Sequence, residues 1–150
     1  MSSPTTAHAR RRAPAPLRWM LALQVALYRR TGGRLAGRVG RTPVLLLTTT
    51  GRKSGARHTV PLGYFDAEGV RYVVASNGGA PRDPAWYLNL VAHPEVGVQV
   101  GADVYTAVAR PATGEERTRL WERLMATAPM YRRYARARRE IPLVVLTPKG

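Results

Sequence analysis

The chain has 150 residues, no cysteine, 24 lysines and arginines against 9 acids, and a net charge of +15. This length predicts one domain, and the lack of thiols excludes disulfides, thiolate metal sites and a cysteine nucleophile. The three histidines (His8, His58 and His93) are too scattered to indicate a metal cluster. The positive charge lies mainly on the N-terminal arm and on a late helical segment, and it attracts any polyanion, be it anionic lipid, nucleic acid or an acidic cofactor.

The N-terminal part divides into two stretches. Residues 1–16 are rich in Ser, Pro, Thr and Arg and are predicted to form a disordered basic arm. Residues 17–41 are predicted to form an amphipathic helix, over 17–30, followed by a Gly-rich linker. The apolar stripe of this helix consists of Leu17, Met20, Leu21, Val25 and Tyr28.

The helix at 17–30 is too short to cross a bilayer, which needs about 20 apolar residues. No small-residue cleavage site follows it, so it does not read as a secretory signal. It could lie on an anionic membrane surface or pack on the core of its own domain. We therefore expect a cytoplasmic protein, with residues 17–30 as a candidate contact to the inner face of the plasma membrane.

Residues 42–150 alternate between short strands and a few helices. The strands are expected at 43–50, 58–65, 70–76, 95–100, 103–111 and 141–148. Pro61 indicates a bulge or an edge position in its strand. The helices are expected after an Asp83–Pro84 N-cap, after a capping box that starts at Thr113, and over the basic segment 130–140. Short turns between strands predict antiparallel pairing, and the whole predicts an α+β, mainly β, small barrel with helices filling its corners.

The most informative loop follows the strand that ends in three threonines. Gly51 and Gly55 bracket Arg52, Lys53 and Ser54. A glycine-bounded turn lets backbone N–H groups converge, while the side chains add positive charge and a hydroxyl donor. This is the chemistry of a phosphate or carboxylate site, although a solvated basic hairpin turn has the same composition.

Two further features carry candidate function. Ser76, Asn77, Gly78 and Gly79 form a glycine loop that permits a close approach to a flat ligand, and Trp86 in the next helix could stack on a ring. A plain loop followed by core aromatics is the alternative. Tyr131 and Tyr134 lie three residues apart, which suits either a substrate mouth or a packing stripe. With no hydrolytic motif present, demanding chemistry would need an organic cofactor.

Five motifs in this order resemble the deazaflavin-dependent nitroreductase family: LLLTTTGRKSG, TVPLGYF, VVASNGGAPRDPAWYLNL, HPEVGVQVG and ATGEERTRLWERL. These are F420H2-dependent quinone and nitro-compound reductases of actinobacteria and their relatives. The likeness covers roughly residues 17–148. It implies a split β-barrel related to FMN-binding proteins of the pyridoxamine-phosphate-oxidase type. It also implies hydride transfer from reduced coenzyme F420 to a quinone, a nitro compound or another activated small acceptor.

The resemblance also implies a set of site residues. The phosphate and acidic tail of the coenzyme would lie on Arg52, Lys53 and Ser54, and the anion contact at the end of that loop would fall to Arg57 or His58. The ring groove would be lined by Thr59, Val60, Pro61, Ser76, Asn77, Gly78, Gly79 and Trp86. Tyr131 and Tyr134 would border the acceptor, and Ser76 or Tyr131 could hydrogen-bond its oxygen as charge develops. These three, Ser76, Tyr131 and Tyr134, are the candidate catalytic residues, and no metal ligand is implied.

The sequence departs from the family pattern at three points. The family loop reads GRKSGxxR, whereas here Arg57 comes one residue early and His58 takes the last position. Asn77 stands where some members have lysine. Ala128 stands where some nitroreducing members have tyrosine, which weakens the expectation of nitroimidazole reduction but leaves that of coenzyme binding intact.

Two alternatives remain at this point. A reductase that uses FMN in the same barrel would be yellow when purified. A non-catalytic coenzyme-carrying or nucleic-acid-binding module would show strongly salt-dependent binding. No specific nucleic-acid partner is expected, because outside Tyr131 and Tyr134 no aromatic residue interrupts the arginine clusters as a stacking platform. The expected partners are therefore a quinone-like or nitroaromatic acceptor and an anionic membrane surface, in a monomer or a homodimer.

Overall fold

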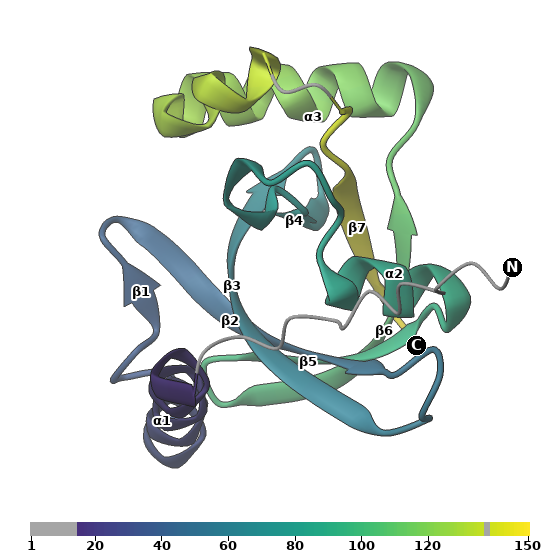
Figure 1. The fold of residues 1–150 in the computed structure, drawn as a ribbon. Helices are drawn as coiled ribbons and strands as arrows, with labels where there is room; N and C mark the ends of the chain where they lie inside the picture. The colour runs from purple at the N-terminus through teal and green to yellow at the C-terminus, as the bar shows by residue number, and fades with distance from the viewer. Residues whose placement is uncertain (1–14, 137–138) are drawn as a thin grey trace, which may run out of the picture.

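The computed structural model describes residues 15–136 and 139–150, in which a small barrel is surrounded by helices (Figure 1). Most of the predicted disordered arm lies outside the described residues. The strands are β1 (Arg38–Val39), β2 (Thr42–Thr50), β3 (Arg57–Ala67), β4 (Val70–Val74), β5 (Glu95–Val100), β6 (Asp103–Pro111) and β7 (Leu143–Pro148). The α-helices are α1 (Ala15–Thr31), α2 (Ala85–Ala92) and α3 (Gly114–Thr127), and the 3-10 helices are η1 (Asn77–Gly79) and η2 (Pro129–Arg136).

Six of the strands close on themselves in the order β2-β3-β4-β7-β6-β5, because β5 also pairs with β2. Every pairing is antiparallel, and the last strand of the chain, β7, lies between β4 and β6. The two-residue strand β1, within the predicted linker, adds to β2 outside this ring. The predicted antiparallel barrel with peripheral helices is confirmed.

Pro61 occupies an edge position and not a bulge. It pairs with Leu46 in an unbroken register between β2 and β3. Pairing of β3 with β4 begins only at Tyr64, so the first part of β3 has a single neighbouring strand among the described residues. A residue without an N–H is tolerated at such a place.

Alternation along β2 builds the two sides of the barrel wall. Leu45 and Leu47 face the interior, where they pack with Val96, Val98 and Leu90 of the next elements. Val44 and Leu46, which alternate with them along β2, face outward and are covered by α1. A second apolar cluster lies under α3 and includes Tyr72, Leu120, Leu124, Leu143 and Val145. Parts of the barrel wall are therefore buried on both faces. Polar sites are left to the rim of the barrel and to its helices.

The N-terminal helix packs through fewer residues than its periodicity predicted. Tyr28 is buried, and its hydroxyl donates to the carbonyl of Gln99 (3.3 Å) and accepts from the amide of Gly101 (2.7 Å). Leu17 and Met20, predicted on the same stripe, are 44% and 67% exposed. Among residues 15–136 and 139–150, no helix is both long and apolar enough to cross a membrane.

The predicted N-cap of α2 is wrong, and the predicted capping box of α3 has the right N-cap residue without its side-chain hydrogen bonds. Pro84, not Asp83, is the N-cap of α2, and the Asp83 carboxylate instead accepts a hydrogen bond from Arg139 at 2.6 Å. Thr113 is the N-cap residue of α3, but its side chain caps nothing, and Glu116 binds Arg110 through both carboxylate oxygens. In both cases an arginine binds the carboxylate through a charge-assisted hydrogen bond, which is among the stronger hydrogen bonds in proteins.

The predicted helix over 130–140 is shorter and tighter than expected. A 3-10 helix, η2, ends at Arg136, and residues 139 and 140 are irregular. Residues 137 and 138 lie outside the described part of the chain.

Candidate functional site

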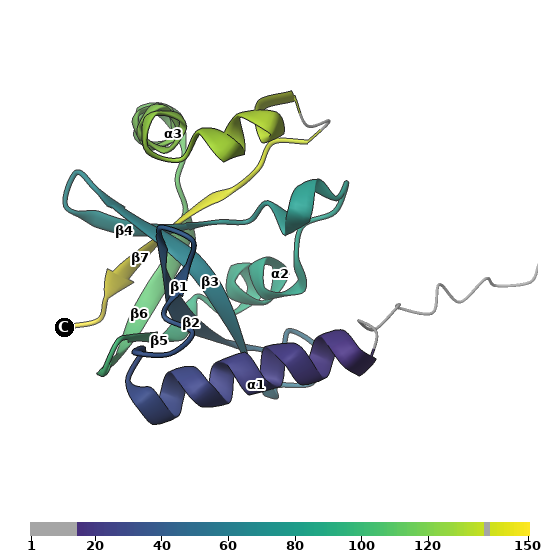
Figure 2. The same cartoon turned by 90° about the vertical axis from the view of Figure 1, so that its left-hand side faces the viewer.

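Helical segments follow one another down one side of the barrel. Figure 2 shows α1 at the bottom, then α2, the teal turn of η1 and, at the top, the yellow-green η2. The residues that the sequence singled out come from this side: the loop between β2 and β3 (the basic loop, residues 51–56), the start of β3, the loop after β4 (the glycine loop, residues 76–79), α2 and η2.

The basic loop is a tight turn closed by its own backbone. The amide of Gly51 donates to the carbonyl of Ala56 (2.7 Å), and the amide of Gly55 donates to the carbonyl of Gly51 (2.9 Å). A Cβ at position 51 would lie 2.6 Å from the Ser54 hydroxyl oxygen and 3.2 Å from the Ala56 carbonyl oxygen, so a larger residue there would crowd the turn. Lys53 and Ser54 are exposed, and the Ser54 hydroxyl accepts from the amide of Ala56. The loop thus presents a cation and a hydroxyl to solvent on a fixed backbone.

Asn89 of α2 anchors this loop. Its side-chain oxygen accepts from the Arg52 amide (3.2 Å) and from the Arg52 guanidinium (3.3 Å), while its Nδ2 donates to Thr49 (3.3 Å). Asn89 is only 6% exposed, and sequence reasoning missed it. The available signal was a single amide within the apolar helix AWYLNLVA, since a buried polar side chain must find partners.

At the start of β3, Arg57 and His58 point to different places. The Arg57 guanidinium reaches over to β5, where its Nη2 lies 3.2 Å from the position of a Cβ on Gly97. The His58 Nε2 lies 3.1 Å from the corresponding position on Gly51, at the base of the basic loop. His58, not Arg57, therefore adjoins the basic loop directly.

A groove of about 600 Å³ separates this part of β3 from α1. Thr59 is held by the Arg29 guanidinium (3.0 Å) and lies 2.7 Å from the Thr48 hydroxyl. Val60 packs on the barrel interior. The groove is lined by Arg18, Leu21, Ala22, Val25, Ala26, Arg29, Arg57, His58, Thr59 and Val60. Three arginines around an apolar floor give this groove a cationic rim.

The glycine loop has an unusual backbone. Asn77, Gly78 and Gly79 all have positive φ, at 48°, 64° and 83°. The side-chain Nδ2 of Asn77 donates to the carbonyl of Arg82 (3.0 Å), so this side chain is turned back on its own loop. A Cβ on Gly78 would meet nothing within 4 Å, which leaves this stretch of backbone open to a ligand, whereas Ser76 beside it is half-buried.

The two tyrosines of η2 lie together, with ring centroids 5.6 Å apart. Tyr134 packs against the glycine loop, because a Cβ on Gly79 would lie 3.0 Å from its ring edge. Its hydroxyl accepts from Arg133 (2.7 Å). Tyr131 packs edge-on against Phe65, and burial raises the pKa of Tyr131 above its ordinary value of 10.0, with the nearby Tyr134 acting in the same direction. The Tyr131 hydroxyl therefore keeps its proton at neutral pH and remains a donor.

Helix α2 connects the two halves of the site. Trp86, in its first turn and half-buried against the barrel core, follows the glycine loop, while Asn89 holds the basic loop. At 1.5 Å rise per residue, these positions are only about 5 Å apart along the helix. Pro61, on the outward face of β3, is not joined to either half by a polar contact, since proline offers no side-chain donor.

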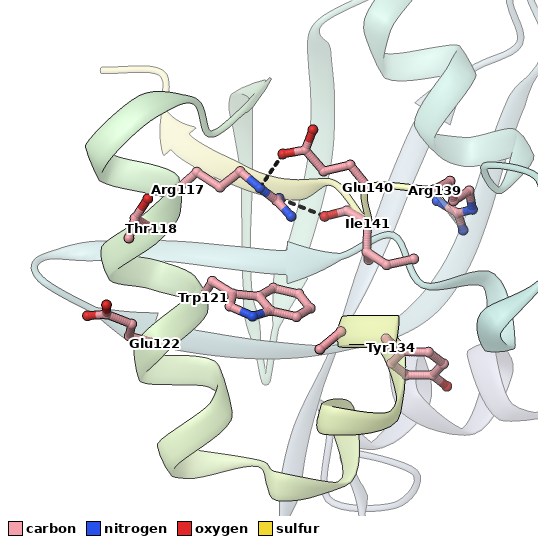
Figure 3. A pocket seen from close by; sticks show the side chains of 9 residues that line it. Arg117, Thr118, Trp121, Glu122, Tyr134, Arg139, Glu140 and Ile141 are labelled. Atoms are coloured by element: carbon pink, nitrogen blue, oxygen red, sulfur yellow. Dashed lines mark hydrogen bonds and ion pairs between the residues drawn. The ribbon is translucent and has the colours of Figure 1, made fainter. Parts of the chain in front are cut away.

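A cavity of about 490 Å³ lies between α3 and the segment that leads into β7 (Figure 3). Tyr134 forms part of its wall. Arg117 lies over the Trp121 ring, donates to the carbonyl of Ile141 (2.7 Å) and pairs with Glu140 (2.5 Å). Arg139 belongs to the same segment and was missed by sequence reasoning, which treated it as one more charge on a basic helix.

Comparisons with known proteins agree on a family. The model of the F420H(2)-dependent quinone reductase family matches residues 19–148. An F420H(2)-dependent quinone reductase of Mycobacterium tuberculosis is 41% identical over 133 residues, which are 85% of this chain and 89% of that protein.

Two solved structures resemble the fold. One is an F420-H2-dependent reductase, with 40% identity, a TM-score of 0.62, and coverage of 69% of this chain and 93% of that one. The other is described as a domain-swapped dimer, with 35% identity, a TM-score of 0.65, and coverage of 88% and 99%. With the closed barrel, these matches confirm the predicted split-barrel fold.

Proposed function

The chain belongs to the F420H(2)-dependent quinone reductase family, and we propose that it passes a hydride from reduced coenzyme F420 to a quinone on the side of the barrel that carries the basic loop and the glycine loop. The observation that carries this proposal is the place of α2, which follows the glycine loop in the chain and binds the basic loop through Asn89. A phosphate-binding end and a ring-binding end are thereby held on one side of the barrel.

The residues present fit this coenzyme. Lys53 and Arg52 supply positive charge for its phosphate and acidic tail, and the Ser54 hydroxyl lies beside them. The open backbone at Gly78 admits a flat ring at close range. We assign the anion contact at the end of the loop to His58, because Arg57 reaches toward β5.

Reduced deazaflavin supplies a hydride, since a carbon atom replaces N5 of the flavin ring and disfavours one-electron steps. The protein orients the two rings and excludes competing geometries. Thr59, Val60 and Pro61 of β3, together with Ser76, Asn77, Gly78, Gly79 and Trp86, would hold the coenzyme ring. Tyr131 donates to the acceptor oxygen as negative charge develops there. Solvent supplies the remaining proton.

Tyr134 has a different role from Tyr131. Its hydroxyl is already bound by Arg133, and its ring rests on Gly79, so it forms a wall of the acceptor site. Ala128 is buried at the end of α3 and contributes nothing to the mouth of the site. We therefore propose that nitroaromatic compounds are poorer acceptors than quinones for this protein.

The deciding experiment is a titration of the purified protein with F420, followed by tryptophan fluorescence, with FMN in parallel. We expect binding at micromolar concentration or tighter for F420, weak binding of FMN, and menadione-dependent oxidation of F420H2. Tight FMN binding would leave the fold assignment unchanged and would identify FMN, not F420, as the coenzyme. Binding of neither, with salt-sensitive binding of DNA, would favour the non-catalytic alternative.

A second proposal concerns α1, whose outward face is apolar. Trp19, Met20 and Leu23 are 78%, 67% and 61% exposed, and Leu27 extends the same face by one turn. Arg30, at the end of the helix, adds positive charge. We propose that this face lies on an anionic membrane, where apolar burial and attraction to headgroups act together.

The test leaves the packed face of α1 intact, because deleting the helix would uncover the barrel wall beneath Tyr28. Replacing Trp19, Met20 and Leu23 by Gln should weaken co-sedimentation with phosphatidylglycerol vesicles at least tenfold. A control variant with Gln at Val104 and Val108, two exposed positions on β6, should sediment like the wild type. A triple variant that stays lipid-bound contradicts the proposal. So does light scattering that shows a dimer dissociated by the triple substitution, since the face would then serve a second copy.

A further inference from the structure

The guanidinium of Arg139 joins both ends of the glycine loop. Its Nη2 donates to the carbonyls of Ala75 (3.2 Å) and Ser76 (3.0 Å), and its Nε donates to the carbonyl of Ala80 (3.0 Å). Its Nη1 binds Asp83 at 2.6 Å. The side chain is 16% exposed. One side chain thus gathers four oxygens from the segment that starts at the end of β4 and stops before α2.

The backbone that these bonds hold is costly to maintain. Three consecutive residues, Asn77 to Gly79, have positive φ, and Asn77 carries a Cβ there. Within the loop, the amide of Gly79 donates to Ser76 (2.9 Å) and the amide of Ala80 donates to Asn77 (3.1 Å). These two short-range bonds leave the loop ends to be fixed from outside, and Arg139 binds them.

Arg139 also connects this loop to the segment that carries the two tyrosines (the tyrosine segment, which consists of η2 with Arg139 and Glu140). It comes five positions after Tyr134, whose ring edge rests on Gly79. The loop and the tyrosine segment are therefore joined twice, by a ring contact and by a guanidinium. In Figure 3, Arg117 lies on one side of Glu140 and Ile141, and Arg139 lies on the other side.

We propose that Arg139 is a positioning residue for hydride transfer. By holding the glycine loop against the tyrosine segment, it sets the gap in which the acceptor ring lies over the coenzyme ring. Arg139 touches neither reactant in this role. The inference rests on the proposed function, which supplies the two rings.

Lysine cannot replace this side chain. The four oxygens are served by three nitrogens in a planar fork, whereas lysine has one nitrogen and no fixed geometry. Arg117 offers a matched control, since its side chain is 18% exposed. It binds Glu140 and the carbonyl of Ile141, which directly follow Arg139 in the chain, but it makes no hydrogen bond to the glycine loop.

The experiment compares Arg139→Lys with Arg117→Lys in the full chain. Amide hydrogen exchange is measured on the protein without coenzyme, and kcat and KM for menadione are measured with F420H2. We expect both variants to lower the melting temperature. Only Arg139→Lys should speed exchange at Gly79 and Ala80 at least tenfold, and only this variant should lower kcat by about tenfold with a smaller change in KM.

Equal exchange rates and equal kcat in the two variants would overturn the positioning role. Faster exchange in Arg139→Lys with an unchanged kcat would overturn it as well, because the loop would then be loosened without consequence for transfer. A wild-type protein that does not reduce quinones contradicts the proposed function itself. The exchange data need no coenzyme and show separately whether Arg139 holds the glycine loop.

Discussion

The backbone amide and the guanidinium of Arg52 both donate to one side-chain oxygen of Asn89, at 3.2 and 3.3 Å. The basic loop is therefore fixed to α2 and not merely presented at the end of a hairpin. The same asparagine donates to Thr49, inside the rim of the barrel. Charge on the loop is held in place by a neutral, buried amide.

Replacing Asn89 by Ala should lower the free energy of unfolding by about 1–3 kcal/mol, because buried partners in Arg52 and Thr49 lose their hydrogen bonds. It should also weaken F420 binding several-fold, since the loop would no longer be pre-ordered. Urea unfolding and a fluorescence titration measure the two effects. Leu88→Ala, one residue earlier and at the surface, should change neither by as much. A destabilised Asn89→Ala protein with wild-type affinity would show that the anchor serves stability alone.

Replacing both Arg52 and Lys53 by Ala should weaken coenzyme binding at least tenfold. The single variants should differ in kind, because Lys53 is exposed whereas Arg52 also binds Asn89. Lys53→Ala is expected to reduce affinity at unchanged stability, and Arg52→Ala to reduce both. Arg123→Ala, an exposed cation on α3, controls for lost net charge. If all three single variants weaken binding equally, general charge and not a defined anion site holds the coenzyme.

Replacing Tyr131 by Phe should lower kcat/KM for quinones by about tenfold, since one preorganised donor to a developing oxyanion would be lost. Tyr134→Phe removes a hydroxyl that Arg133 already occupies, so its effect on the same ratio should be clearly smaller. The affinity for F420 should be similar in the two variants. The opposite ranking would assign the donor role to Tyr134.

Stability should fall as the pH rises past 10. Burial raises the pKa of Tyr28, Tyr87 and Tyr131, and raises the pKa of Tyr72 to about 12. Above pH 10 the unfolded chain thus binds fewer protons than the folded one, so its free energy drops relative to the native state. Urea unfolding over alkaline pH, with tyrosinate absorbance as a second signal, measures this. Ionisation of all seven tyrosines near pH 10 in the folded protein would contradict it.

The barrel was predictable because its signals are local. Apolar runs such as residues 43–50, alternation in residues 95–100, and glycine turns between them depend only on neighbours a few positions away. The same holds for α1 as a helix. Which of its residues pack was not predictable, because that depends on the shape of the barrel surface that meets Val25 and Tyr28.

The organising contacts of the candidate site were not predictable. Asn89 and Arg52 are 37 positions apart, and Arg139 and Ser76 are 63 apart. No spacing rule connects such pairs. The cap at Asp83 failed for the same reason, since an arginine 56 positions later takes its carboxylate. The capping box failed locally, because Glu116 binds Arg110, which is only six positions away.

The position of β7 constrains how the chain can fold. Although β7 comes after the other described strands in the sequence, it is an interior member of the ring, with β4 on one side and β6 on the other. The barrel therefore cannot close around its core before β7 has been synthesised, and a chain cut before Leu143 would leave two open sheet edges where β7 belongs. A chain that still lacks β7 exposes the edges of β4 and β6, and unpaired strand edges promote aggregation, so the period before β7 is inserted is the stage at which this protein most depends on protection from aggregation.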